Sequence, residues 1–258
     1  MATARDVDPR LAIALSGVRE EAGAPWTGGV RATFDWVASL GARGVVIDAT
    51  APETRPRTLD RSARRDLAAS MRRRGLACMG VDLWIPPEHF ASPTHVDRAM
   101  AALEAAAGLA SELCEGVGRV VSIETGEHVG SDLLSVMREM GEDANVRLAD
   151  HRFMKGAGES VARLAEGLDC ASVIMAGGDP ASLLSTRGER IASVRLSDVG
   201  SVGRVGVGNG RLDVAALGAI AGTLWREGPV VIDLRGLRSP GEAARQGIDA
   251  WERARLRV

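Results

Sequence analysis

Charged and aromatic side chains stand at or just after the ends of several short apolar runs in this sequence. A carboxylate in such a place can act as a general acid or base, a histidine can carry a proton or bind a metal ion, and an arginine can stabilise developing negative charge. The residues placed in this way are Asp48, Asp82, Trp84, Glu124, His128, Asp150, His151, Arg195, Asp198, Asp233 and Arg235. Proton transfer or anion binding follows only if the fold brings them together.

The apolar runs alternate with stretches of helical periodicity. Eight runs have the length of a strand, and they begin at Leu11, Gly44, Ala77, Arg119, Val146, Ser172, Ala192 and Pro229. Residues 29–40, 95–113 and 215–225 repeat apolar side chains at helical spacing. Near-continuous apolar strands alternating with helices are typical of a parallel sheet covered by helices. Eight such units predict a single (β/α)8 TIM barrel over residues 1–258, with a doubly wound open sheet as the alternative.

In a TIM barrel the carboxyl ends of the strands meet at one mouth, where active sites lie. Structural roles compete with this interpretation at several positions. Asp48 and Asp82 could cap a turn or pair with an arginine, and a histidine such as His128 or His151 could bond a loop carbonyl. We expect Asp179 to cap the helix that begins at Pro180.

Composition narrows the classes of function. A formal net charge of -2 supplies no basic field for nucleic acid, and no run of 18 apolar residues predicts a membrane span. The polar N-terminus and three well-separated cysteines, Cys78, Cys114 and Cys170, predict a cytoplasmic protein without a disulfide framework or zinc knuckle. Lys155 is the single lysine and therefore the one side-chain amine able to form a Schiff base.

Residues 189–198, ERIASVRLSD, and 205–236, VGVGNGRLDVAALGAIAGTLWREGPVVIDLRG, carry a family pattern. They resemble the sugar phosphate isomerase/epimerase superfamily, whose barrels are related to xylose isomerase and endonuclease IV. Asp198 matches the aspartate of the family's seventh strand, residues 208–210 its G-x-G, and Asp213 the residue that opens the next helix. The resemblance implies a TIM barrel that isomerises or epimerises a sugar or sugar phosphate. DNA cleavage is disfavoured, because it requires a cluster of histidines and carboxylates that this chain lacks.

The metal ligands that the resemblance implies are largely replaced. The family's glutamate, aspartate, histidine and glutamate after strands five to eight fall on Ala149, Met175, Arg195 and Asp233. A shift of one residue would bring in Asp150. A guanidinium about 4 Å from a divalent ion costs on the order of 8 kcal/mol at an effective dielectric constant of about 20. We therefore expect no metal cofactor, with a site relocated onto Glu124, His128 or His151 as the alternative.

Three functions follow. The first is a metal-free isomerase or epimerase in which Glu124 or Asp150 removes a proton next to a carbonyl and Arg195 stabilises the enediolate. The second is a barrel without chemistry that binds a ligand or acts as a scaffold, with Arg195 and Asp233 forming a buried salt bridge. The third is a metal enzyme with a relocated site.

The expected partner is a sugar or sugar phosphate, and a homo-oligomer is compatible with the sequence. The catalytic candidates are Glu124, Asp150, His151, Arg195 and Asp233, and the substrate-binding candidates are Asp48, Asp82, Trp84, Asp198, Arg204 and Arg235.

Overall fold

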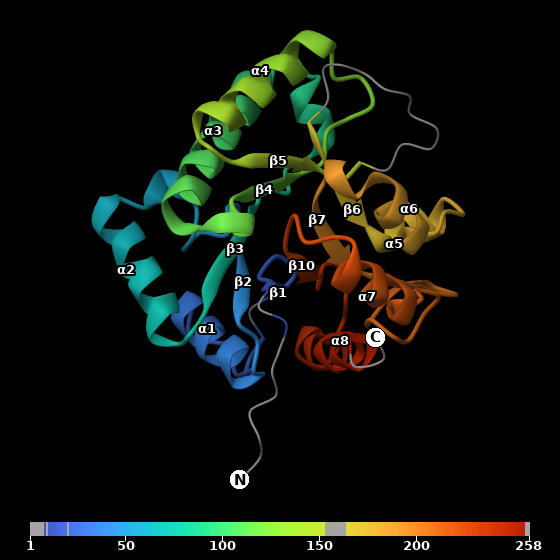
Figure 1. Cartoon of the computed structure of the whole chain (residues 1–258). Helices are drawn as coiled ribbons and strands as arrows, with labels where there is room; N and C mark the ends of the chain where they lie inside the picture. Colours follow the sequence, from blue (N-terminus) through green and yellow to red (C-terminus); the bar gives the residue numbers. More distant parts are fainter. Residues whose placement is uncertain (1–7, 9, 20, 153–163, 256–258) are drawn as a thin grey trace.

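Parallel strands close into a barrel in the computed structural model, which describes residues 8, 10–19, 21–152 and 164–255 (Figure 1). Lys155 lies outside these residues. The barrel strands are β1 (Leu11–Ala14), β2 (Gly44–Asp48), β3 (Ala77–Asp82), β4 (Val120–Ile123), β5 (Arg147–Asp150), β6 (Ala165–Asp169), β7 (Ile191–Leu196) and β10 (Val230–Ile232). Their order around the barrel is β1-β10-β7-β6-β5-β4-β3-β2, so β1 pairs with both β2 and β10. The predicted TIM barrel is confirmed.

Helices cover the outside of the barrel (Figure 1). They are α1 (Val30–Ser39), α2 (Arg61–Arg73), α3 (Val96–Leu113), α4 (Ser131–Asp143), α5 (Cys170–Met175), α6 (Pro180–Arg187), α7 (Val214–Thr223) and α8 (Pro240–Arg255). Short 3-10 turns are η1 (Pro56–Thr58), η2 (Pro87–Phe90), η3 (Gly116–Gly118) and η4 (Gly188–Arg190). Aspartates begin four of the helices, because Asp60, Asp169, Asp179 and Asp213 each accept hydrogen bonds from backbone N–H groups of the first turn. None of the helices in the described part of the chain is both long and apolar enough to cross a bilayer.

The sixth strand differs from the sequence prediction. Residues 172–176 were expected to form it, but they belong to α5 and its end, and β6 is the preceding segment Ala165–Asp169. A short apolar run fits a buried helix as well as a strand. Asp169 decides between them, because its carboxylate accepts a hydrogen bond from the Ser172 amide and caps the helix.

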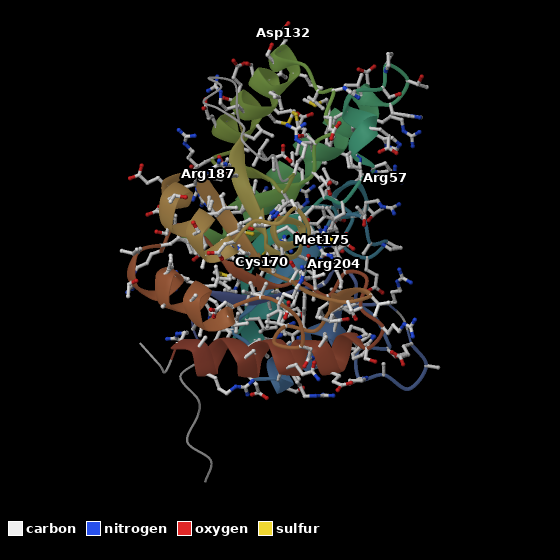
Figure 2. All side chains as sticks on the ribbon, turned by 90° about the vertical axis from the view of Figure 1, so that its right-hand side faces the viewer. Arg57, Asp132, Cys170, Met175, Arg187 and Arg204 are labelled. Carbon is white, nitrogen blue, oxygen red and sulfur yellow. The ribbon has the colours of Figure 1, made fainter. Side chains whose placement is uncertain are left out.

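The glycine-rich stretch after β7 forms a small antiparallel hairpin of β8 (Asp198–Gly200) and β9 (Gly203–Val205). The sequence predicted only a loop here. Because Arg204 lies on β9, the hairpin carries a guanidinium back toward the barrel mouth. In Figure 2, Arg204 lies near the middle of the view, with α8 below it and the α4 residue Asp132 at the top.

Candidate active site at the barrel mouth

A buried ion pair crosses the interior of the barrel. Arg195 on β7 and Asp82 at the end of β3 stand four strands apart in the closed order, on opposite walls, and both are completely buried. The Arg195 Nη1 donates to Asp82 Oδ2 at 3.1 Å and Nη2 donates to Oδ1, so the contact is bidentate. The Nη2 atom also donates to Ser122 Oγ at 2.7 Å, and Ser16 Oγ donates to Asp82.

The structure corrects the partner predicted for Arg195, which is Asp82 rather than Asp233. It also shows that Arg195 is not offered to a ligand from the mouth, since the side chain is inaccessible and both terminal nitrogens are engaged. Its Nε has no hydrogen-bond partner among the described residues. Arg195 therefore links β7 to Asp82 of β3 and Ser122 of β4 inside the barrel and is not accessible to a ligand at the mouth.

Asp169, Asp233, Arg204 and Arg235 form a second network, nearer to solvent, which we call the mouth quartet. Arg204 contacts Asp169 at 2.5 Å and Asp233 at 3.1 Å, and Arg235 contacts the same two carboxylates at 3.2 and 2.5 Å. The carboxylates are buried, whereas each arginine side chain keeps 23% of its surface exposed. The quartet therefore presents two partly accessible guanidinium groups, held by buried acids.

The charges of the quartet shape its pKa values. Burial opposes ionisation of Asp233, but Arg235 first, followed by Arg195 and Arg204, outweighs it and holds the Asp233 pKa below its usual range. Burial also works against the charged form of Arg235, yet Asp233 raises the Arg235 pKa above that of a free arginine. Asp233 and Arg235 therefore stabilise each other's charged forms, and Asp169 and Asp233 together raise the pKa of Arg204 in spite of its burial.

Trp84 connects the two networks. The guanidinium carbon of Arg235 lies 3.7 Å from the centre of the Trp84 ring, within the distance for a cation–π interaction, and that of Arg195 lies 5.3 Å away. The indole also meets the His151 ring edge-on at 5.5 Å, and its Nε1 donates to Ser16 Oγ at 3.3 Å. Trp84 thus supplies the aromatic face on which the Arg235 guanidinium packs.

His151 is a buried, neutral side chain. Its Nε2 lies 3.2 Å from Ser122 Oγ and 3.4 Å from Ser193 Oγ, while its Nδ1 has no partner among the described residues. Burial, and secondarily the charge of Arg195, lowers the pKa of His151 well below that of a free histidine. The ring also fills the space beside Gly167, where an added Cβ would come within 2.5 Å of it. His151 is consequently shielded from a ligand at the mouth.

Glu124 is an exposed carboxylate within electrostatic range of the mouth quartet. It follows β4 and is exposed, yet neighbouring atoms displace enough water to raise its pKa above that of a free glutamate. Burial is the main cause; Asp150 and Asp169 add to it, and Arg235 and Arg204 oppose it. The same interactions place the Glu124 carboxyl in the field of the mouth quartet.

Two other predicted site carboxylates, Asp48 and Asp150, accept hydrogen bonds from residues of the neighbouring loops. Asp150 accepts hydrogen bonds from the backbone N–H and hydroxyl of Thr125 and from the Arg152 amide, which ties the loops after β4 and β5 together. Asp48 binds the amide and hydroxyl of Thr50 and is half-buried, and burial raises its pKa. His128 is exposed.

Asp198 has an internal role as well. Its carboxylate is fully buried and accepts from four backbone amides, those of Val199, Gly208, Gly210 and Leu212, at 2.8 to 3.0 Å. The aspartate and the glycines of the family pattern are thus joined in one loop-organising motif. The expected substrate contact of Asp198 gains no support from this geometry.

Sequence reasoning missed Asp169 and the interior serines. With β6 at its observed position, the aspartate that the family resemblance places after the sixth strand falls on Asp169, not on Met175. The N-cap pattern of Asp169 before Cys170 was the available signal. Ser16, Ser122 and Ser193 carried none, because a serine within an apolar strand does not reveal which buried partner it faces.

The donor set at the mouth does not fit a divalent metal. Asp169 and Asp233 occupy two of the implied ligand positions, but both are bound by Arg204 and Arg235, and Arg195 stands at the histidine position. No group of three or more histidine, cysteine or acidic side chains converges as a metal site within the described ranges. Guanidinium groups cannot ligate a metal and repel it.

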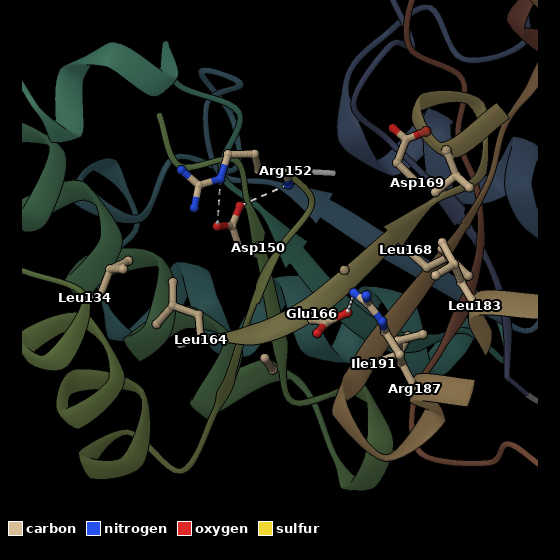
Figure 3. Close-up of a pocket in the computed structure, with 13 residues that line it drawn as sticks. Leu134, Asp150, Arg152, Leu164, Glu166, Leu168, Asp169, Leu183, Arg187 and Ile191 are labelled. Atoms are coloured by element: carbon tan, nitrogen blue, oxygen red, sulfur yellow. Dashed lines mark hydrogen bonds and ion pairs between the residues drawn. The ribbon is translucent and has the colours of Figure 1, made fainter. Parts of the chain in front are cut away.

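Two hollows border this region. The larger, about 710 Å³, is lined by Arg204, Asn209, Arg238, Gln246 and other residues between the hairpin and the start of α8. A cavity of about 80 Å³ between β5 and β6, with an Arg187–Glu166 ion pair at 3.5 Å in its wall, is too small for a sugar (Figure 3). The larger hollow shares Arg204 with the mouth quartet, so a ligand there would meet its exposed edge.

Comparison with known proteins defines the fold. No protein-family model matches the chain, and no curated protein matches it in sequence. Among solved structures, a xylose isomerase domain protein from Planctomyces limnophilus has a TM-score of 0.71 at 15% identity, covering 98% of this chain and 99% of that one. An L-ribulose 3-epimerase has a TM-score of 0.70 at 14% identity, with 96% of each chain covered. IolI, a protein solved with a bound zinc atom, has a TM-score of 0.68 at 12% identity and covers 96% of this chain and 98% of its own. The chain therefore has the fold of the xylose isomerase-like sugar isomerases and epimerases.

Proposed function

We propose that this protein is an isomerase- or epimerase-like enzyme that acts on a small polar or anionic sugar at the barrel mouth without a divalent metal. The observation that carries the proposal is Glu124, an exposed carboxylate with a raised pKa that lies within electrostatic range of the partly accessible guanidinium groups of Arg204 and Arg235. The fold supports the substrate class, because several barrels of this shape are sugar isomerases or epimerases.

The chemistry requires a base and a cationic partner for an enediolate. In the proposed reaction Glu124 removes the proton next to the substrate carbonyl, and a raised pKa makes it the stronger base. Arg235 and Arg204 donate N–H groups to the oxygen that gains negative charge, and their positive charges stabilise the enediolate. Trp84 holds Arg235 in place, and returning the proton from Glu124 to the same or a neighbouring carbon completes epimerisation or isomerisation.

The phosphate of a phosphorylated substrate would lie in the hollow beside Arg204 and Arg238, next to the N-terminus of the sixteen-residue helix α8. TIM barrels commonly hold phosphate groups near the loops after their last two strands. Asp169 and Asp233 already neutralise much of the charge of the quartet, so a neutral sugar is an equally good ligand for the remaining donors.

Proton exchange with solvent tests this proposal directly. The protein is incubated in D2O and EDTA with aldoses, ketoses and their phosphates, and NMR measures loss of the C–H signal next to the carbonyl. We expect exchange with at least one sugar, and a rate at least about 100-fold lower for Glu124→Gln, in line with the usual contribution of a general base. Glu127→Gln is the matched control, since Glu127 is an exposed acid of the same loop.

A binding protein without chemistry is the second candidate. It is favoured by the Arg195–Asp82 pair, because these two site candidates are buried and bound to each other, which makes them unavailable to a ligand at the mouth. Saturable thermal stabilisation by a sugar, without C–H exchange and without an effect of Glu124→Gln, would establish this candidate and refute the enzyme.

A further inference from the structure

Two of the three thiols meet at the amino-terminal end of the barrel. Cys78 is the second residue of β3, and Cys114 directly follows α3; a parallel β-bridge pairs their backbones. Their Sγ atoms lie 2.8 Å apart, and both residues are buried. This separation is closer than ordinary packing of two thiols, although longer than the bond of about 2.05 Å in a disulfide. Cys170 lies elsewhere, at the carboxyl-terminal end of the barrel, beside Asp169.

We propose that Cys78 and Cys114 form a reversible disulfide when the protein meets a two-electron oxidant such as hydrogen peroxide. Backbone pairing already sets the two residues side by side, so the bond requires rotation of two side chains and no displacement of β3 or α3. The proposal is independent of the sugar chemistry proposed above.

The hydrogen bond between the two thiols indicates which cysteine reacts first with peroxide. The Cys114 thiol donates to Cys78 Sγ, and this bond together with burial raises the Cys114 pKa well above that of a free cysteine. Cys78 therefore reacts first: its thiolate attacks a peroxide oxygen, an S–O bond forms, the O–O bond breaks and hydroxide leaves. Cys114 then gives up its proton and attacks the Cys78 sulfur; the S–S bond forms, the S–O bond breaks and water leaves. Two thiols and one peroxide yield one disulfide and two waters.

The crosslink would fasten the chain between α3 and β4 to the start of β3. Cys78 and Cys114 are 36 positions apart in sequence, and the segment between them contains Trp84 and all of α3. A disulfide across such a loop restricts the unfolded chain and stabilises the fold. The mouth residues lie at the other end of the barrel, so oxidation should leave sugar exchange unchanged.

Peptide mapping tests the pairing without ambiguity. The cysteines fall in three separate tryptic peptides, residues 75–98, 99–119 and 164–187. The reduced full-length protein is treated with hydrogen peroxide, its remaining thiols are blocked with a maleimide in denaturant, and the peptides are identified by mass spectrometry. We expect residues 75–98 and 99–119 to be joined, only Cys170 to be labelled, and dithiothreitol to restore all three thiols. The reaction should accelerate as the pH rises, because the thiolate is the reacting form.

Matched variants complete the experiment. Cys170→Ala should still lose two thiols and gain in melting temperature on oxidation, whereas Cys114→Ser should lose none to an internal disulfide. Peroxide that converts Cys78 to a sulfinic acid, links Cys170, or leaves all three thiols free would overturn the proposal. If Cys114→Ser fails to fold, the wild-type peptide map decides alone.

Discussion

Arg195 places a permanent positive charge inside the barrel, and its environment explains how the fold tolerates it. Asp82 supplies a bidentate carboxylate, Ser122 accepts from Nη2, and Trp84 provides an aromatic face. Isolated buried charges are costly, whereas a paired and hydrogen-bonded charge is supported by its neighbours. The two side chains act as one unit, because removing either one leaves the other as an unpaired charge in the interior.

Breaking this unit should destabilise the protein strongly. Arg195→Met leaves Asp82 buried and unpaired, and we expect the free energy of unfolding to fall by about 3–5 kcal/mol in urea denaturation. The double variant Arg195→Met, Asp82→Leu should recover a large part of that loss. Arg138→Ala removes an exposed ion pair with Glu142 and should cost less than about 1 kcal/mol. Equal losses in the buried and exposed pairs would contradict this account.

The buried His151 should make stability fall in mild acid. Its folded pKa lies well below the value of 6.5 for a free histidine, so between these two values the unfolded chain binds more protons. The stabilisation is fully present above pH 6.5 and decreases as the pH falls, by up to about 1.4 kcal/mol per pH unit. Urea denaturation from pH 7.5 to pH 5 measures the slope.

Variants assign this slope to its residue. His151→Gln should flatten the change in unfolding free energy below pH 6.5, and His128→Gln, at an exposed histidine, should leave it in place. A slope that survives His151→Gln would assign the acid sensitivity to other groups.

At the scale of elements, the β8–β9 hairpin positions the mouth quartet. It delivers Arg204 from outside the barrel, and it is anchored at its base by the Asp198 carboxylate, which binds four backbone amides. Gly208 has a positive φ of 90°, and a Cβ on Gly210 would lie 2.3 Å from Asp198 Oδ1. The loop therefore needs glycine at both positions in order to approach the carboxylate closely.

Removing this anchor should loosen the hairpin. Asp198→Ala leaves four amides without their acceptor, and we expect the unfolding free energy to fall by more than about 3 kcal/mol, since each unsatisfied buried donor costs about 1–3 kcal/mol. Hydrogen exchange at Gly208, Gly210 and Leu212 should accelerate. Asp213→Ala, which removes one cap of α7, should cost about 1 kcal/mol. Unchanged exchange in Asp198→Ala would show that the hairpin is held by other contacts.

Most of the strands and several residues of the mouth could be predicted from the sequence. Alternation of apolar strands and helices predicted the barrel, and the rule that strand ends meet at one mouth brought Glu124, Trp84, Asp233 and Arg235 into one region. Arg204 was predicted beside them from the glycine-rich loop, and it contacts Asp233. The sixth strand was wrong because its residues, AEGLD, are less apolar than the helix that follows.

The partner of Arg195 was missed for a geometric reason. Asp82 and Asp233 both end barrel strands, and only the closed order shows that β3, and not β10, lies across from β7. The hydroxyl network around His151 was likewise unpredictable, since it depends on which side chains face each other within the barrel.

For the whole molecule, the arginines that bind the mouth carboxylates predict independence of divalent cations. Melting temperatures measured with EDTA, Mn²⁺ or Zn²⁺ should agree, because no convergent ligand set among the described residues gives an added cation a preferred site on the folded state. Elemental analysis of protein purified without chelator should find well under one metal ion per chain. A stoichiometric metal, or clear stabilisation by Mn²⁺, would refute the assignment of the mouth to arginine chemistry.

The salt bridge across the barrel also limits how this protein can change over generations. Replacing Arg195 alone, for example by a metal-binding side chain, strands the Asp82 charge in the interior, and replacing Asp82 first strands Arg195. Each single step therefore crosses a stability loss comparable with much of the total stability of an ordinary domain. The two positions are therefore coupled, and either one can change only through simultaneous or compensated substitutions.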